Sequence, residues 1–192
     1  HFAVIPDEGN VRVGSGGATL SVIRYIKEQE DAKRSRQQEE SDALQKEAAG
    51  TAEENSERSL FAGLRILVIH SGGDSKRVPA YSALGKLFSP VPHRLPDGRS
   101  STLFDEFIIA MSSVPSRIRE GMLLVSGDVL LLFNPLQIDF SDRGAAAISF
   151  KEQVETGKNH GVFLNSEDGN VKRFLHKQTV ETLTAAGAVN EN

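Results

Sequence analysis

The segment LRILVIHSGG at residues 64–73 places two glycines directly after a largely aliphatic run. A run of this length and composition predicts a buried strand. Glycine after a strand adopts backbone angles that other residues avoid, and it lets a phosphate approach main-chain N–H groups closely. The segment therefore predicts a fold in which a buried strand ends in a tight glycine turn without side chains.

The other apolar runs alternate between strand and helix patterns. Expected strands occupy residues 2–5, 64–70, 121–133, 145–150 and 160–164, and expected helices occupy 18–29 and 101–114. Strands that alternate with helices predict an α/β fold: a mostly parallel, Rossmann-like sheet with helices on both faces. Ligands of such sheets bind outside the carboxyl ends of the strands.

Each expected helix has an apolar stripe at helical spacing. Ser101 or Thr102 is positioned to cap the second one. The first stripe consists of Leu20, Ile23 and Ile26 with Tyr25 beside it, and the second consists of Leu103, Phe107, Ile108 and Met111.

Composition excludes several classes of function. The chain has 192 residues, a net charge of −4 and no cysteine. Its length suits one substantial domain over residues 1–192, and its charge gives no basic surface for nucleic acid. Without cysteine there is no disulfide or thiolate nucleophile. No apolar run approaches the roughly 18–20 residues that cross a bilayer, so we expect no membrane association and a cytoplasmic protein.

Residues 28–58 are rich in Glu, Gln, Lys, Ala and Ser and contain almost no large apolar residue. This composition predicts a solvated helix or a polar insertion within the domain. The chain begins with His1 rather than methionine, and we expect it to be an excerpt of a longer protein.

A second glycine cluster, VGSGGATL, occupies residues 13–20. It nearly meets the dinucleotide fingerprint GxGxxG through Gly14, Gly16 and Thr19, so a dinucleotide-dependent oxidoreductase is one interpretation. The first cluster does not spell a Walker A motif, because Ala80 stands in place of its first glycine and Leu87 in place of its hydroxyl residue.

Two basic residues follow the first glycine pair: Arg77 is four positions after Gly73, and Lys86 is thirteen positions after it. Attack on an α-phosphate expels pyrophosphate, so the protein must neutralise charge on the leaving group and on the phosphoryl oxygens. The amides of Gly72 and Gly73 suit phosphate oxygens. The planar guanidinium of Arg77 suits the departing pyrophosphate, and Lys86 suits the α-phosphate.

Asp128 interrupts the apolar run of residues 121–133. A buried carboxylate without a partner is costly. A hydrogen-bonded turn would satisfy it, and metal binding is the more economical account of its position.

Four segments in order resemble one enzyme family. HSGGDSKRVPAYSALGKLFSPVP (70–92) is similar to the signature of sugar-nucleotide pyrophosphorylases, in particular the fucose-1-phosphate guanylyltransferase family, which in some organisms is fused to an L-fucose kinase domain. RVGSGGATL (12–20), HGVFL (160–164) and KRFLHK (172–177) agree in the same order.

The resemblance implies a GT-A-like nucleotidyltransferase domain that makes GDP-L-fucose and pyrophosphate from GTP and L-fucose 1-phosphate with Mg²⁺. It implies that Arg77 and Lys86 are the catalytic cations and that Asp128 binds the metal. By the same resemblance, Gly14, Gly16, Gly17, Gly72 and Gly73 line the nucleotide site, and His160, Gly161 and Lys177 line the substrate site.

The chain departs from the family pattern in two places. The family commonly has proline after the last lysine, whereas Gln178 follows Lys177 here, so we expect a looser turn. The chain also stops before the region that supplies a second metal-binding carboxylate in such enzymes, so we expect it to carry part of a site.

Purely structural roles remain open as alternatives for individual residues. Alone, His160 indicates a structural histidine, Lys177 a surface lysine and His70 a packing residue. A structural turn explains Gly14–Gly17 as well as nucleotide contact does. For the whole chain, the alternatives are a pyrophosphorylase for another sugar 1-phosphate or nucleoside triphosphate, and a nucleotide-sugar-binding module without turnover.

Overall fold

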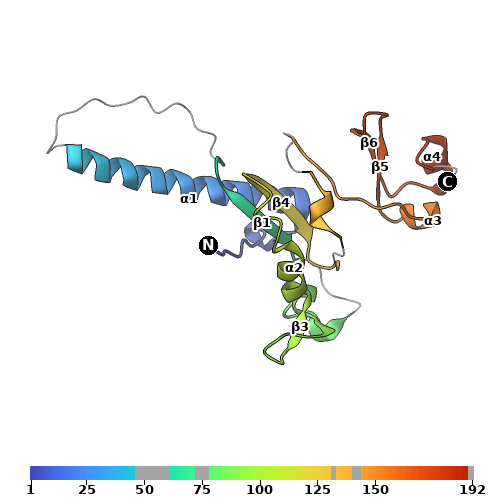
Figure 1. The fold of residues 1–192 in the computed structure, drawn as a ribbon, viewed down its shortest axis with the longest axis horizontal. Helices are drawn as coiled ribbons and strands as arrows, with labels where there is room; N and C mark the ends of the chain where they lie inside the picture. Colours follow the sequence, from blue (N-terminus) through green and yellow to red (C-terminus); the bar gives the residue numbers. More distant parts are fainter. Residues whose placement is uncertain (46–60, 72–77, 131–132, 140–143, 190–192) are drawn as a thin grey trace. The chain divides into compact units, whose positions relative to one another are not determined.

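The computed structural model describes residues 1–45, 61–71, 78–130, 133–139 and 144–189 (Figure 1). The chain divides into two compact units, His1–Asp142 and Arg143–Asn192. We refer to them as unit 1 and unit 2 and describe each by itself.

Unit 1 begins with a long helix, α1 (Gly14–Gln45). The helix starts four residues earlier than the sequence predicts, and so it includes the second glycine cluster. Leu20 was expected on its apolar stripe but is 64% exposed, whereas Ile23 and Ile26 of the same stripe are partly covered.

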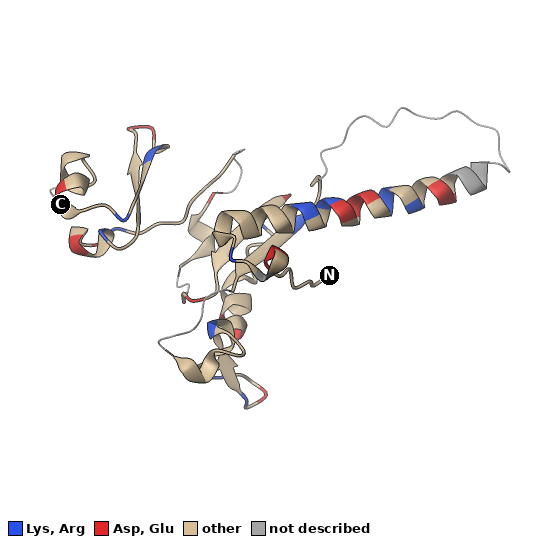
Figure 2. Cartoon of the chain, turned by 180° about the vertical axis from the view of Figure 1, so that it is seen from behind, with Lys and Arg blue, Asp and Glu red and all other residues tan. Residues whose placement is uncertain are grey.

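The polar tract continues α1 as a solvated helix through Gln45. Every residue from 31 to 40 is exposed. Acidic and basic side chains alternate along this part (Figure 2), and Lys27 pairs with Asp31 one turn away at 2.7 Å. Such pairs support an isolated helix modestly. The prediction of a solvated helix is confirmed here, and residues 46–58 of the tract lie outside the described residues.

Strands β1 (Arg65–His70) and β4 (Gly121–Ser126) pair in parallel, from Arg65 opposite Gly121 to His70 opposite Ser126. The run at 121–133 was expected to be a strand interrupted at Ser126–Asp128, and β4 indeed ends at Ser126 in a turn at Gly127 and Asp128.

The expected fold class is correct only as far as a mixed α/β structure. In the described residues, β1 and β4 form the one parallel pair, and the two other sheets are antiparallel pairs. The strands expected at 2–5 and 145–150 are absent. Phe2 and Phe150 are 82% and 84% exposed, because these apolar runs have no neighbouring strand with which to form a ladder.

Helix α2 (Leu103–Met111) follows strands β2 (Pro90–Arg94) and β3 (Ser100–Thr102), which pair antiparallel. Thr102 caps the helix in a capping box with Asp105, as the sequence predicts. Phe107 and Met111 are buried, whereas Ile108 is 46% exposed and so does not belong to the buried face. The core of unit 1 comprises Val68, Leu87, Phe107, Met111 and Val114.

Unit 2 is a β-hairpin with two short helices. It contains α3 (Val154–Gly157), β5 (Gly161–Asn165), β6 (Val171–His176) and α4 (Val180–Ala185). β5 and β6 pair antiparallel. Leu175 and Leu183 are buried, and a Cβ placed at Gly157 would contact Val162 and Leu183. One face of the hairpin therefore packs against the helices.

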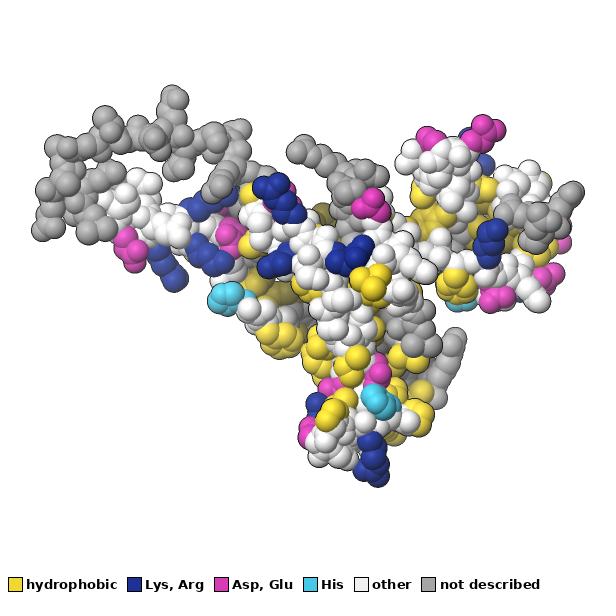
Figure 3. Space-filling model, viewed as in Figure 1, with side chains coloured by type: hydrophobic (Ala, Val, Ile, Leu, Met, Phe, Trp, Pro, Cys, Tyr) yellow, Lys and Arg dark blue, Asp and Glu magenta, His cyan; other side chains and the backbone are white. Residues whose placement is uncertain are grey.

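Hydrophobic side chains also reach the surface of both units (Figure 3). Within the described part of the chain, no helix combines the length and the apolar character that a bilayer span requires.

Candidate active site

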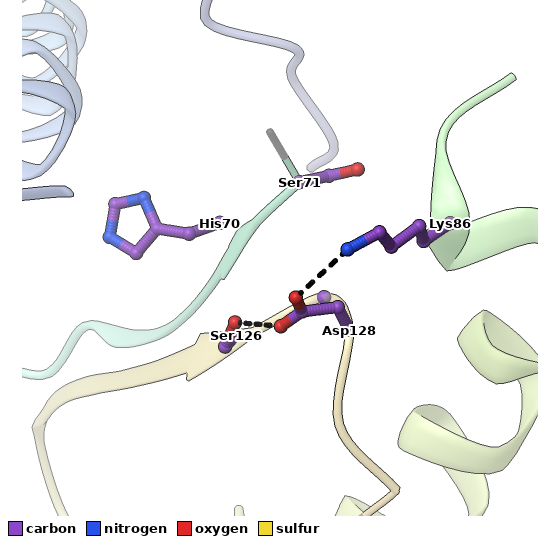
Figure 4. A pocket seen from close by; sticks show the side chains of 6 residues that line it. His70, Ser71, Lys86, Ser126 and Asp128 are labelled. Atoms are coloured by element: carbon purple, nitrogen blue, oxygen red, sulfur yellow. Dashed lines mark hydrogen bonds and ion pairs between the residues drawn. The ribbon is translucent and has the colours of Figure 1, made fainter. Parts of the chain in front are cut away.

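The carboxyl ends of β1 and β4 form a small polar pocket (Figure 4). These ends lie side by side because His70 is paired with Ser126. This is the edge of a parallel sheet at which α/β proteins bind ligands. The residues that line the pocket are His70, Ser71, Lys86, Ser126, Gly127 and Asp128.

Two glycines let the pocket walls approach one another. The amide of Gly127 donates to the carbonyl of His70 at 2.9 Å, and a Cβ at Gly127 would lie 3.1 Å from that oxygen. Gly85 has a φ of +78°, which side chains disfavour. Its Cα faces the Ser71 hydroxyl, since a Cβ there would lie 3.4 Å from Ser71 Oγ. The 3₁₀ turn Lys86–Phe88 therefore starts beside the end of β1.

Asp128 is the acidic group of the pocket, and both of its oxygens have partners. Ser126 Oγ donates to Asp128 Oδ1 at 2.6 Å, and Lys86 Nζ contacts Asp128 Oδ2 at 3.3 Å (Figure 4). The Ser126 hydrogen bond, and then the Lys86 ammonium, lower the pKa of Asp128 below its ordinary value. The carboxyl group is therefore ionised at neutral pH.

Asp128 lies where the sequence predicts an interruption of the apolar run, but it is not buried. The Lys86 and Asp128 side chains are 33% and 46% exposed, because β4 ends two residues earlier and Asp128 lies in the turn. The carboxylate is thus satisfied locally and open to solvent, so a ligand of the pocket can reach it.

His70 points away from the Lys86–Asp128 pair (Figure 4). Its Nε2 lies 3.0 Å from Thr19 Oγ1 in α1. The Thr19 hydroxyl donates its one proton to the Ser15 carbonyl at 2.8 Å, so it accepts from His70, whose Nε2 carries hydrogen. His70 is therefore a packing residue, which fixes the first turns of α1 against the end of β1.

The glycines of the second cluster occupy the first turn of α1. Helix N-termini present amides without intrahelical acceptors. Gly14 has a φ of +72°, and a Cβ at Gly17 would lie 2.7 Å from Val13 Cβ. Local geometry therefore accounts for these two. A Cβ at Gly16 would meet no atom within 4 Å, so packing gives no reason for that glycine.

Three of the residues selected from sequence, Gly72, Gly73 and Arg77, lie outside the described residues. Their assigned roles in phosphate and pyrophosphate binding stay predictions.

His160, Gly161 and Lys177 are brought together within unit 2, at the open end of the β5–β6 hairpin. Gly161 pairs with His176, and the Lys177 amide donates to the His160 carbonyl at 2.9 Å. Lys177 has a φ of +51°. A residue other than glycine rarely adopts this left-handed conformation, which is a form of strain that functional sites often contain.

Gln178 stands where the resemblance leads us to expect proline, and its side chain stabilises the turn after β6. Its side-chain amide donates to the His176 carbonyl at 3.0 Å and so closes the turn around Lys177. Proline at 178 would favour an extended Lys177 backbone, whereas glutamine is compatible with the left-handed one. The expected looser turn is therefore held by a side-chain hydrogen bond.

The oxygen donors of the pocket determine how the expected Mg²⁺ could be held. In the part of the chain that the structure describes, no three His, Asp or Glu side chains gather as a metal cluster. Mg²⁺ is commonly held by one or two carboxylates together with substrate phosphates. One exposed carboxylate, Asp128, fits a Mg²⁺ ion that arrives with a nucleotide and does not provide a closed protein cage.

Residues 58–192 match the description "Fucose pyrophosphorylase domain". The chain belongs to this family. It is 28% identical to the bifunctional fucokinase/GDP-fucose pyrophosphorylase of Arabidopsis thaliana and 28% identical to the fucose-1-phosphate guanylyltransferase of Mus musculus. It is 26% identical to the Homo sapiens enzyme of the latter name. No solved structure matches it.

These alignments cover 96–98% of this chain but only 18%, 29% and 28% of the three relatives. The chain therefore spans less than a third of the length of each. The resemblance inferred from the four segments is confirmed at the level of the family.

Sequence reasoning missed Ser126, Ser71 and Gly127 as parts of the pocket. The signal for two of them was present, because Ser-Gly-Asp interrupts an otherwise apolar run at residues 126–128. Ser126 was missed because its role depends on the Asp128 side chain folding back onto the end of β4.

Proposed function

We propose that this chain carries the nucleotidyl-transfer site of an enzyme that makes GDP-L-fucose from GTP and L-fucose 1-phosphate. A phosphate oxygen of the sugar phosphate attacks the α-phosphorus of GTP. The bond from that phosphorus to the bridging oxygen of the β-phosphate breaks, and pyrophosphate leaves with the electron pair. The products are GDP-L-fucose and pyrophosphate, so atoms and charge balance.

The observation that carries the proposal is the Lys86–Asp128 pair at the carboxyl edge of β1 and β4, in a chain of this family. Lys86 is proposed to bind the α-phosphate oxygens, where charge grows in the transition state. Positioned charge of this kind supplies much of the catalysis in phosphoryl-type transfers. Ser126 is proposed to hold Asp128 through Oδ1.

Asp128 is the residue proposed to contact Mg²⁺. When bound, Mg²⁺ would neutralise phosphate charge and orient the triphosphate. The first turn of α1 is proposed to present its amides to the nucleotide, with His70 and Thr19 fixing its position. Lys177 is proposed to bind the phosphate of the sugar phosphate. Arg77, Gly72 and Gly73 keep the roles that the resemblance implies.

A pyrophosphate-release assay on the full-length protein tests the proposal, with GTP, β-L-fucose 1-phosphate and Mg²⁺. We expect release that requires both substrates and stops with EDTA. A competition among the four nucleoside triphosphates checks the base, and preference for UTP or ATP would replace GTP in the proposal. Tight GDP-fucose binding in calorimetry without pyrophosphate release would instead indicate a binding module without turnover.

A further inference from the structure

The β5–β6 hairpin has one face that its own helices leave uncovered. Val162 and Leu175 form a cross-strand pair on the face that packs against α3 and α4. Side chains alternate along a strand, so the next pairs, Phe163 with Phe174 and Gly161 with His176, lie on the opposite face. We call these four residues the aromatic face.

The three rings of the aromatic face contact one another. The Phe163 and Phe174 centroids are 5.1 Å apart, and those of Phe174 and His176 are 6.2 Å apart with the planes only 26° from parallel. Phe174 is nevertheless 53% exposed. The rings therefore support each other from the sides while the Phe174 ring remains open to solvent.

Gly161 shapes this face. A Cβ at Gly161 would lie 2.5 Å from Phe174 Cε2 and 2.6 Å from Cζ. The Phe174 ring therefore rests directly on the backbone of Gly161, and a Cβ at this position would force the ring to shift. The face extends in this way to the open end of the hairpin, where the Lys177 amide is bonded to His160.

The face adjoins positive charge. Lys177 follows His176 directly in the left-handed turn that Gln178 closes. An apolar ring surface with a lysine at its edge complements a ligand that joins an apolar ring face to a phosphate.

We propose that the aromatic face binds the sugar ring of a deoxysugar 1-phosphate, with its C–H face against Phe174 and His176 and its phosphate toward Lys177. The electron-rich face of an aromatic ring attracts polarised C–H groups and also gains dispersion contacts. A 6-deoxysugar has a methyl group in place of a hydroxymethyl group, so it loses less hydration there. The inference rests on the proposed function and adds the residues that recognise the sugar.

The test compares Phe174→Leu with wild type in the full-length protein. Leucine keeps an apolar side chain and removes the ring. We expect the KM for β-L-fucose 1-phosphate to rise about 2- to 13-fold, the range that loss of an aromatic contact of about 0.5–1.5 kcal/mol gives. The KM for GTP and the melting temperature stay unchanged. Phe150→Leu is the matched control, since Phe150 is an exposed phenylalanine outside the hairpin.

Gly161→Ala is a second variant, because it displaces the ring without removing it and should raise the same KM. Saturation-transfer NMR with β-L-fucose 1-phosphate gives a readout apart from turnover. The ring and methyl protons should receive saturation in wild type and lose most of it in Phe174→Leu.

Four outcomes overturn the inference. A rise in the KM for GTP alone would mean that the rings stack on the base. Unchanged KM values with a lower melting temperature would mean that the face packs against another part of the full-length protein. A wild-type protein without turnover on these substrates would remove the proposed function and this inference together, whereas wild-type turnover with an unaffected Phe174→Leu removes this inference alone.

Discussion

Lys86 and Asp128 are separated by 42 positions in the chain, and their side chains meet at 3.3 Å. The contact joins the 3₁₀ turn Lys86–Phe88 to the turn after β4. It places one cation and one carboxylate in the same pocket, and the proposed function requires both.

Lys86→Ala tests this pair. We expect kcat to fall about 10²–10³-fold, as when one preorganised group that stabilises transition-state charge is removed. Stability should change little, since a partly exposed pair contributes about 0.2–1 kcal/mol. Steady-state kinetics and thermal denaturation of the full-length protein measure both. Lys151→Ala, an exposed lysine outside the pocket, is the control. Near-normal turnover in Lys86→Ala would remove Lys86 from the mechanism.

Gly16→Ala separates a structural from a nucleotide-binding role for the start of α1. A methyl group at this position meets nothing within 4 Å, so alanine should raise the free energy of unfolding by about 0.4–1 kcal/mol. If Gly16 contacts the nucleotide, as proposed, the KM for GTP should rise several-fold. Gly17→Ala should instead lower stability, because its Cβ would lie 2.7 Å from Val13 Cβ. A stabilised Gly16→Ala with unchanged KM contradicts the nucleotide contact.

Gly127→Ala tests the close approach of the two strand ends. Its Cβ would lie 3.1 Å from the His70 carbonyl oxygen, and that backbone atom can move only if β1 and β4 separate. We expect a loss of about 1–3 kcal/mol in the free energy of unfolding, the usual cost of overpacking. Urea denaturation measures it, and the Gly16→Ala variant serves as the reference for a tolerated methyl. Stability equal to wild type would mean that the strand ends are not held as described.

Asp105→Asn tests the ion pair at the start of α2. Hydrogen bonds from Arg99 and then Thr102 lower the pKa of Asp105 from 3.8 to about 2. A depressed carboxyl pKa stabilises the fold above the unfolded pKa, and this stabilisation is lost as the pH falls through the folded one. The melting temperature of wild type should therefore exceed that of the variant by a constant amount near neutral pH. The difference should shrink as the pH falls from about 3.8 towards 2.

Asp97→Asn is the matched control for that titration, since Asp97 also contacts Arg99, at 3.1 Å from its Nε. This variant removes the other carboxylate contact of Arg99 and leaves the contacts of Asp105 with Arg99 and Thr102 in place. A flat difference for Asp105→Asn from pH 7 to 2 would contradict the assigned cause.

Local sequence signals determined the elements that depend on neighbouring residues. The aliphatic run before Gly72 became β1, Thr102 became the cap of α2, and Gly161 and its neighbours became a hairpin strand. Helix capping, turn formation and the alternation of side chains along a strand depend on a few neighbouring residues. They can therefore be predicted from the local sequence. The order of the four family segments was also sufficient to identify the family.

Tertiary structure decided which of these elements meet. The expected strands at 2–5 and 145–150 have the right composition but no partner strand, and α1 extends through glycines that local propensity disfavours. Strand pairing depends on contacts between distant residues, which a local pattern does not encode.

The same reason explains what the sequence alone determined about the site and what it did not. In the sequence, Lys86 was selected by its spacing from the glycine pair, and Asp128 was selected by the apolar run that it interrupts. Only the parallel pairing of β1 with β4, with Gly127 at its end, put the lysine against the carboxylate and added Ser126 as its second partner. The sequence gives the chemistry of each side chain, whereas the tertiary structure determines which strand ends lie side by side and so which side chains interact.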